Sequence, residues 1–219
     1  MIKAIIFDFD GLIVDTESIW YEAYRDALVE HDFHLTLEHF GQVIGTSSGA
    51  LDRLIQENVA VEVDLDAINE KADSLYKKKL LSPALREGVQ SYVDAAKENG
   101  LKLAVASSSG RAWVEGYLEQ LGIRHEFHII KTREDVERVK PDPALYLEAL
   151  KALQIDANEA IVFEDSFNGL KAASAAGIKC VIVPNPVTSH LPFEGHALHL
   201  HSMADMKLVD VMEELQKVK

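Results

Sequence analysis

Residues 3–11 read KAIIFDFDG, an apolar run that ends in two aspartates separated by one residue. An uninterrupted apolar run of this kind is typical of a central strand in a parallel sheet, which is buried on both faces. Ligands of open parallel sheets bind beyond the carboxyl ends of the strands. We therefore expect Asp8 and Asp10 to lie at the ligand-binding edge of such a sheet.

The chain from about residue 86 onward alternates short β-rich runs with helical patterns. Asp142 and Pro143 are expected to cap and open one of these helices, and other helical patterns end at glycines. The alternation predicts an α/β fold with a doubly wound, Rossmann-like parallel sheet and helices on both faces. The strand candidates after the first are 102–107, 127–131, 160–163 and 179–183, with a weaker one at 197–200.

Residues 16–80 differ from the rest because they show helical spacing and no convincing strand. We interpret them as an α-helical insertion, or cap, after the first strand, with residues 1–15 and 81–219 forming the core that contains the sheet. The cap region carries a net charge of −7, half of the total. A cap of that charge is not a basic clamp for a large anion.

The composition excludes several classes of partner. The chain has 219 residues, of which 47% are hydrophobic, and a net charge of −14, so nucleic acid and anionic membrane surfaces are disfavoured. Apolar runs stay well below the ~20 residues of a membrane span, and the N-terminus does not resemble a signal peptide. A single cysteine, Cys180, excludes an internal disulfide and suits a reducing compartment. We expect a cytoplasmic protein, and a monomer because no coiled-coil repeat is present.

Polar side chains gather in four short segments, each placed where a predicted strand ends or a helix begins. Any one of them is weak evidence, because such residues are common in turns and helix caps. Together and in this order they predict a single crevice at the carboxyl edge of the sheet. The segments are DFDG at 8–11, SSSG at 107–110, Lys140-Pro141, and EDS at 164–166.

These residue types can hold and transfer a phosphoryl group. A carboxylate can attack phosphorus to form an aspartyl-phosphate, and a second carboxylate can protonate the leaving oxygen and later activate water. Ser107 and the loop after it supply donors for phosphate oxygens, and Lys140 supplies positive charge. Four acids brought together require a cation, and hard oxygen ligands suit Mg²⁺. The predicted metal-site acids are Asp8, Asp10, Glu164 and Asp165.

The motifs DFDGLIVDT, VASSS, KPDP and FEDSFNGLKAASAAG resemble those of the haloacid dehalogenase superfamily. Within it the chain is similar to β-phosphoglucomutase-like phosphatases that carry a helical cap. The resemblance covers nearly the whole chain and implies a Mg²⁺-dependent phosphoric monoester hydrolase acting on a small phosphorylated metabolite, with sugar phosphates as one class.

The resemblance also implies a role for each motif residue. Asp8 corresponds to the nucleophile and Asp10 to the general acid/base, and both would ligate the metal, Asp10 through its main-chain carbonyl. Ser107, followed by Ser108, corresponds to the phosphate-binding serine. Lys140 corresponds to the lysine that orders the nucleophile and the phosphate. The metal-binding acid pair corresponds to Glu164 and Asp165.

Alternatives to a phosphatase remain at this stage. The metal-binding acids argue against a dehalogenase. A β-phosphoglucomutase-type mutase often has a histidine where this chain has Trp20, and a basic residue in the segment that here reads Gly-Thr-Ser-Ser-Gly at 45–49. These departures favour hydrolysis over mutase activity. A non-catalytic acidic binding protein on the same fold is the alternative from another class.

Overall fold

The computed structural model describes residues 1–31, 33–41, 49–59 and 63–217, and its chain divides into two compact units. The α/β unit contains Met1–Asp15, Ala84–Pro184 and Pro192–Lys219. The helical unit contains Thr16–Pro83 and Asn185–Leu191. Within the described ranges, no helix is both long enough and apolar enough to cross a membrane.

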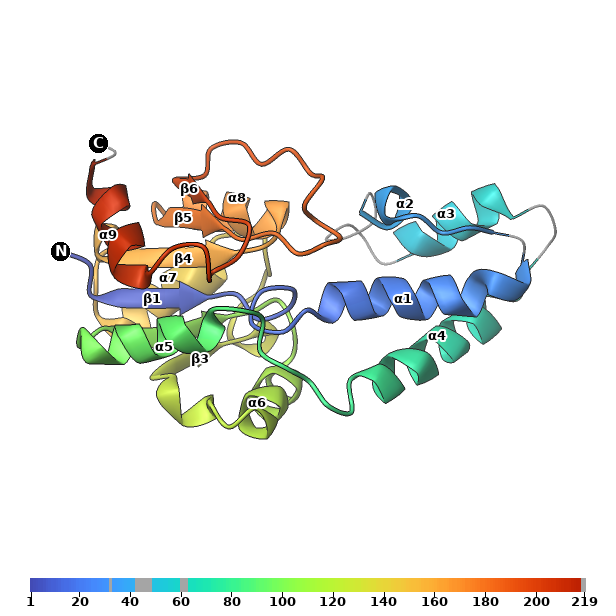
Figure 1. The fold of residues 1–219 in the computed structure, drawn as a ribbon, viewed down its shortest axis with the longest axis horizontal. Coiled ribbons are helices and arrows are strands. Elements are labelled where there is room, and N and C mark those ends of the chain that lie inside the picture. Colours follow the sequence, from blue (N-terminus) through green and yellow to red (C-terminus); the bar gives the residue numbers. More distant parts are fainter. Residues whose placement is uncertain (32, 42–48, 60–62, 218–219) are drawn as a thin grey trace. The chain divides into compact units, whose positions relative to one another are not determined.

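A parallel sheet of six strands forms the centre of the α/β unit (Figure 1), in the order β3-β2-β1-β4-β5-β6. This arrangement confirms the predicted α/β fold. Of the five strands after β1, four are shorter than the ranges predicted from the sequence. The fifth, β4, extends one residue beyond its predicted range and includes Glu164. The strands are β1 (Ala4–Phe7), β2 (Lys102–Ala106), β3 (Ile129–Lys131), β4 (Ala160–Glu164), β5 (Lys179–Ile182) and β6 (Leu198–His199).

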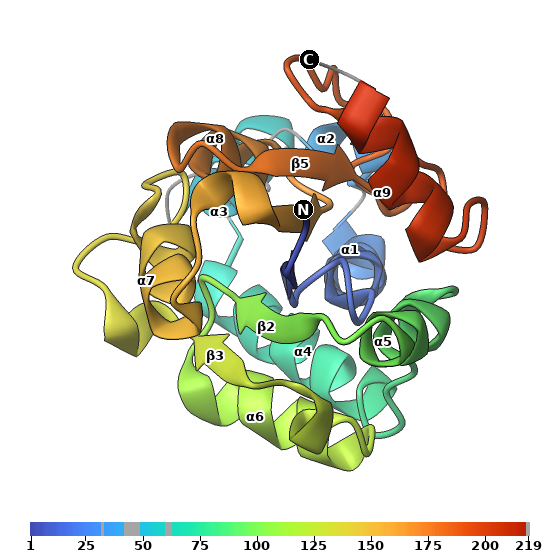
Figure 2. The ribbon, with the colours of Figure 1, turned by 90° about the vertical axis from the view of Figure 1, so that its left-hand side faces the viewer.

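Helices cover both faces of this sheet. Viewed along the strands, α7 and α8 lie on one face while α5 and α9 lie on the other (Figure 2). Short 3-10 turns occupy Arg124–Glu126, Arg133–Asp135 and Ala157–Glu159. The helices of the unit are α5 (Val89–Glu98), α6 (Arg111–Gln120), α7 (Ala144–Leu153), α8 (Phe167–Ala175) and α9 (Leu208–Lys217).

The start of α7 differs by one residue from the prediction. The helix begins at Ala144, and Pro143 rather than Asp142 is its N-cap. The Asp142 carboxylate still accepts a hydrogen bond from the Ala144 N–H at 3.0 Å. Its capping function is therefore retained from one position further out, because a short aspartate side chain can reach an N–H two residues on.

The continuous apolar run of β1 is explained by its central position. All four of its side chains are fully buried, and Phe7 stacks on Phe163 of β4 with ring centroids 5.6 Å apart. In the ladder, Phe7 lies opposite Val105 on one side and Phe163 on the other. The residues that follow these three positions therefore leave the sheet at the same edge.

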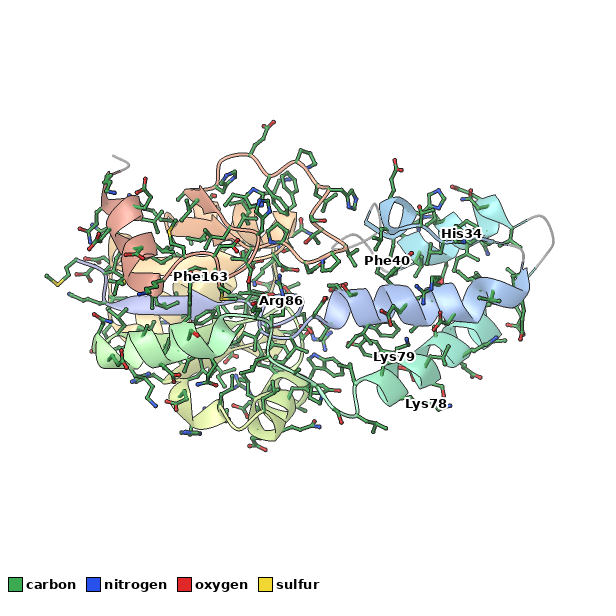
Figure 3. The ribbon with its side chains drawn as sticks, in the orientation of Figure 1. His34, Phe40, Lys78, Lys79, Arg86 and Phe163 are labelled. Carbon is green, nitrogen blue, oxygen red and sulfur yellow. The ribbon has the colours of Figure 1, made fainter. Side chains whose placement is uncertain are left out.

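Arg86 (Figure 3) forms hydrogen bonds with two segments of the α/β unit that lie close to its boundaries with the helical unit. Its guanidinium donates to the carbonyl oxygens of Gly11, Val183 and Pro184, the last at 2.6 Å. Its backbone N–H donates to the Ile13 carbonyl at 2.9 Å. Burial lowers the pKa of Arg86, and its fork of donors supplies hydrogen bonds to all three carbonyls.

The helical unit is built from α1 (Thr16–Leu28), α2 (Leu37–Gly41), α3 (Ala50–Asn58) and α4 (Leu65–Lys79), with a 3-10 turn at Val29–His31. No strand occurs among its described residues, in agreement with the helical spacing of the sequence. Buried residues from these helices, including Phe40 (Figure 3) and Ile55, form an apolar core.

Residues Asn185–Leu191 group with the helical unit although they follow β5 in the chain. Val187 is fully buried in the same apolar core as Phe40 and Ile55. The Asn185 side chain accepts from the N–H groups of Val187 and Thr188, which shapes this short segment into a turn. The sequence has no pattern that assigns these residues to the helical unit.

Candidate active site

Asp8 is placed by the end of β1. Its backbone N–H continues the ladder by donating to the Phe163 carbonyl at 3.0 Å. The register of β1 and β4 brings it beside Glu164, the last residue of β4. Both side chains are buried. Two acids that are distant in sequence thus meet at the carboxyl edge of the sheet, as the sequence pattern predicts.

Lys140 comes from the loop before α7 and reaches the same point. Its ammonium group pairs with Asp8 and, at 2.6 Å, with Glu164, and only 5% of its side chain is exposed. The ammonium also lies 4.9 Å from the centre of the Tyr146 ring. The two carboxylates raise the pKa of Lys140 against the opposing effect of burial, so the group stays charged at neutral pH.

Glu164 accepts hydrogen bonds from several directions. Besides Lys140, the Tyr146 hydroxyl donates to it at 2.6 Å. The backbone N–H groups of Asp165 and Ser166 and the Ser166 hydroxyl donate to its other oxygen at 3.1–3.3 Å. A fully buried carboxylate is stable only when its acceptor sites are used in this way. Its position is therefore well defined.

Gly169 in α8 leaves the space that the Glu164 carboxylate occupies, because a Cβ atom at this position would overlap that carboxylate. We expect Gly169→Ala to destabilise the protein by about 1–3 kcal/mol or more, the usual cost of overpacking. Gly116→Ala is the matched control: this glycine of α6 has nothing within 4 Å of its added Cβ, and alanine there should stabilise by roughly 0.5–1 kcal/mol. Urea unfolding measures both, and equal midpoints for the two variants would contradict the prediction.

Asp165 completes a group of acids with Asp8 and Glu164. One carboxylate oxygen from each lies within 4.8 Å of the others, and all three residues are buried. Burial raises the pKa of Asp8, Lys140 opposes this rise, and Glu164 and Asp10 add to it. The three acids outnumber the cationic groups that act on them, which are Lys140 and, through Asp165, Arg86. A divalent cation would offset the remaining negative charge, and the hard oxygen donors suit Mg²⁺.

Asp10 directs its side chain to the segment after β2 rather than into this acidic group. The Ser109 hydroxyl donates to its Oδ2 at 2.6 Å and the Ser107 hydroxyl at 3.3 Å. The Trp113 indole N–H donates to its Oδ1 at 2.9 Å. The carboxylate of the second aspartate is therefore hydrogen-bonded to the segment after β2 and to α6, while its charge still acts on Asp8.

Ser107 and Ser108 occupy the turn between β2 and α6. Ser107 is buried, and its Oγ accepts from the Ser109 N–H at 3.0 Å, whereas Ser108 is half-buried. The N–H of Arg111, at the start of α6, donates to the Glu134 carboxylate at 3.0 Å. The N-terminus of α6 thus already binds one carboxylate, as expected because the free N–H groups and the dipole of a helix N-terminus favour negative charge.

Sequence reasoning did not assign site roles to Ser109, Trp113 and Tyr146. Tyr146 lies within the apolar pattern of α7 and is fully buried, and a buried tyrosine usually needs a hydrogen-bond partner. That expectation was the one signal available for it. Trp113 lies in the first turn of α6, but its partner is 103 positions away in the chain, which no local pattern indicates.

The features that distinguish a mutase lie in the helical unit. Trp20 packs against the apolar core of this unit and stacks on Tyr76 with ring centroids 3.9 Å apart. Residues 45–48 of the predicted Gly-Thr-Ser-Ser-Gly segment are outside the described residues. Gly49 is described and precedes α3 with a left-handed conformation, and its carbonyl accepts from the N–H of Arg53 at 3.1 Å.

Comparisons with known proteins agree with this geometry. The chain is 44% identical over 216 residues to YhcW, a candidate phosphatase of Bacillus subtilis, covering 98% of both chains. It is 30% identical over 179 residues to the phosphorylated carbohydrates phosphatase of Thermotoga maritima, covering 81% of this chain and 82% of that protein.

Among solved structures, a variant of CbbY from Rhodobacter sphaeroides in complex with xylulose-1,5-bisphosphate matches with a TM-score of 0.73 and 28% identity. The match covers 94% of this chain and 96% of that one. A family model described as haloacid dehalogenase-like hydrolase matches residues 5–183, which contain all four motifs. The chain therefore belongs to the haloacid dehalogenase-like hydrolases.

Proposed function

We propose that this phosphatase-type hydrolase is Mg²⁺-dependent and cleaves a small phosphate monoester through an aspartyl-phosphate on Asp8. The observation that carries the proposal is the placement of Asp8. It is buried at the end of β1, paired with Lys140, and grouped with Glu164 and Asp165. An aspartate in such surroundings is suited to act as a nucleophile toward phosphorus.

In the first step, a carboxylate oxygen of Asp8 attacks phosphorus and the bond to the ester oxygen breaks. Asp10 gives a proton to the leaving alcohol. Lys140 neutralises charge that develops on the transferring phosphoryl group, and the Ser107 hydroxyl turns from Asp10, to which it donates at 3.3 Å, to one of the phosphoryl oxygens. In the second step, Asp10 takes a proton from water, the water oxygen attacks phosphorus, and phosphate leaves with Asp8 regenerated as a carboxylate.

The residues that would hold Mg²⁺ are Asp8, Glu164 and Asp165, with the main-chain carbonyl of Asp10. When bound, the ion would supply positive charge that offsets the repulsion between these acids and the phosphoryl oxygens. The fit rests on the donor set: three buried carboxylates that each place one oxygen within 4.8 Å of the others.

The proposed substrate is a small phosphorylated metabolite of the sugar phosphate class. Support comes from the relative that acts on phosphorylated carbohydrates and from the CbbY structure that holds a sugar bisphosphate. The helical unit is proposed to act as a cap that excludes water during transfer. We further propose a cytoplasmic monomer, in keeping with the buried free thiol of Cys180.

Phosphate release from p-nitrophenyl phosphate and from a panel of sugar phosphates tests the proposal. We expect release with Mg²⁺, and a loss of about 10²-fold or more with EDTA that is reversed by added Mg²⁺. Product analysis by phosphorus NMR distinguishes the mutase, because an isomerised sugar phosphate without free phosphate would identify that activity. Absence of metal-dependent release from every substrate would contradict a phosphatase and favour a binding protein.

A further inference from the structure

We propose that Trp113 is a positioning residue for Asp10: its indole N–H holds one oxygen of this carboxylate and so sets the direction from which Asp10 exchanges protons. The inference rests on the proposed function, in which Asp10 is the general acid/base. None of the four motifs includes Trp113, which lies in α6 three residues after the last glycine of SSSG.

The contact is specific for one oxygen of the carboxylate. Trp113 Nε1 donates to Oδ1 at 2.9 Å, while the hydroxyls of Ser109 and Ser107 donate to Oδ2. Donors on both oxygens fix the rotation of the carboxylate as well as its position. With donors on Oδ2 alone, the group could still turn about the bond to its Cβ atom.

The chemistry of the donor matters as much as its place. An indole N–H is a hydrogen-bond donor only, whereas a serine hydroxyl can both donate and accept. The indole also does not ionise in the accessible pH range. Oδ1 is therefore always the acceptor in this contact.

The indole is held by the helix that carries it. The backbone N–H of Trp113 donates to the Gly110 carbonyl at 3.1 Å, which places this residue in the first turn of α6. Its ring meets the ring of Tyr117 edge-on, with centroids 4.6 Å apart, and Tyr117 in turn lies 6.5 Å from Phe9. A side chain restrained on two sides can orient its partner, because little conformational freedom is lost when the hydrogen bond forms.

This contact also separates the two functions of the DFDG motif. Asp8 is grouped with the acids of the predicted metal site, and the Asp10 carboxylate is absent from that group of described residues. The hydroxyl donors from the segment after β2 keep the Asp10 carboxylate turned toward that segment. A second aspartate drawn to the cation through its side chain would lose the orientation that proton transfer requires.

The kinetic test replaces Trp113 by phenylalanine, which keeps an aromatic ring against Tyr117 and removes the N–H. We expect kcat for phosphate release to fall roughly tenfold, as for the loss of one hydrogen bond to a charged group, with KM changed less than about twofold. Tyr117→Phe is the matched control, because it changes the same aromatic pair but leaves the N–H in place. It should retain kcat within about twofold.

A second measurement reads the contact without activity. The chain has two tryptophans, so a ¹H–¹⁵N spectrum shows two indole resonances, and the spectrum of Trp113→Phe or of Trp20→Phe identifies the one from Trp113. Asp10→Asn should move this resonance upfield by more than its linewidth and leave that of Trp20 in place, because a neutral acceptor makes a weaker hydrogen bond.

The outcomes separate the two proposals. A parent enzyme without Mg²⁺-dependent phosphate release overturns the proposed function, and the spectra still report whether Trp113 contacts Asp10. If the parent is active, an unchanged kcat in Trp113→Phe overturns the positioning role. An unmoved Trp113 resonance in Asp10→Asn overturns it as well, including in the case that Trp113→Phe does not fold.

Discussion

Asp8→Asn is expected to lose phosphatase activity by at least about 10³-fold, because an amide cannot replace the carboxylate nucleophile. The expected loss corresponds to about 4 kcal/mol of transition-state stabilisation. Asparagine has nearly the same shape as aspartate, and Lys140 keeps its second partner, Glu164, at 2.6 Å. The variant should therefore fold, so that the loss is chemical rather than structural.

Initial rates of phosphate release with saturating Mg²⁺, for the parent and for Asp8→Asn, measure the effect. Mass spectrometry of the parent, quenched in acid during turnover, should show one added phosphoryl group, and the variant should show none. Circular dichroism and urea unfolding control for folding. An Asp8→Asn protein that hydrolyses the substrate as fast as the parent would exclude an aspartyl-phosphate at this position.

Lys140→Ala is expected to affect both activity and stability. Phosphate release should fall by about 10²–10³-fold, the usual effect of removing one electrostatic donor from an active site. The free energy of unfolding in the absence of divalent cations should fall by about 3–5 kcal/mol, because Asp8 and Glu164 are left buried without their partner.

Lys151→Ala is the matched control for this variant. Lys151 lies in α7 and forms an ion pair with Glu148 at 3.2 Å, but 76% of its side chain is exposed. Surface pairs of this kind contribute about 0–1 kcal/mol, so this variant should keep the activity and nearly the stability of the parent. If Lys140→Ala behaved like Lys151→Ala in urea unfolding and in turnover, the central role assigned to Lys140 would be wrong.

Much of the fold could be predicted from the sequence because its signals are local. The buried run of β1 and the alternation of strands and helices appear within windows of a few residues. Strand ends then predict where polar side chains meet, because parallel strands share one carboxyl edge. This reasoning brought Asp8, Lys140 and Glu164 to one site, although 132 positions separate Asp8 from Lys140.

The same reasoning cannot identify contacts that depend on side-chain packing. Tyr146 follows the apolar period of α7 like its neighbours, and only the packing of α7 on the sheet directs its hydroxyl to Glu164. Arg86 likewise resembles any charged residue before a helix. Its role becomes visible only when Gly11, Val183 and Pro184 are brought within reach of one guanidinium.

The local apolar period and the geometry of parallel strands were sufficient to predict the α/β class and the meeting of Asp8, Glu164 and Lys140 at one edge of the sheet. The packing of Asn185–Leu191 with the helical unit and the hydrogen bond from Trp113 to Asp10 are visible only in the folded chain. These depend on contacts between residues distant in the chain, and such contacts leave no periodic trace in the sequence because they are selected by shape and hydrogen bonding after the elements have packed.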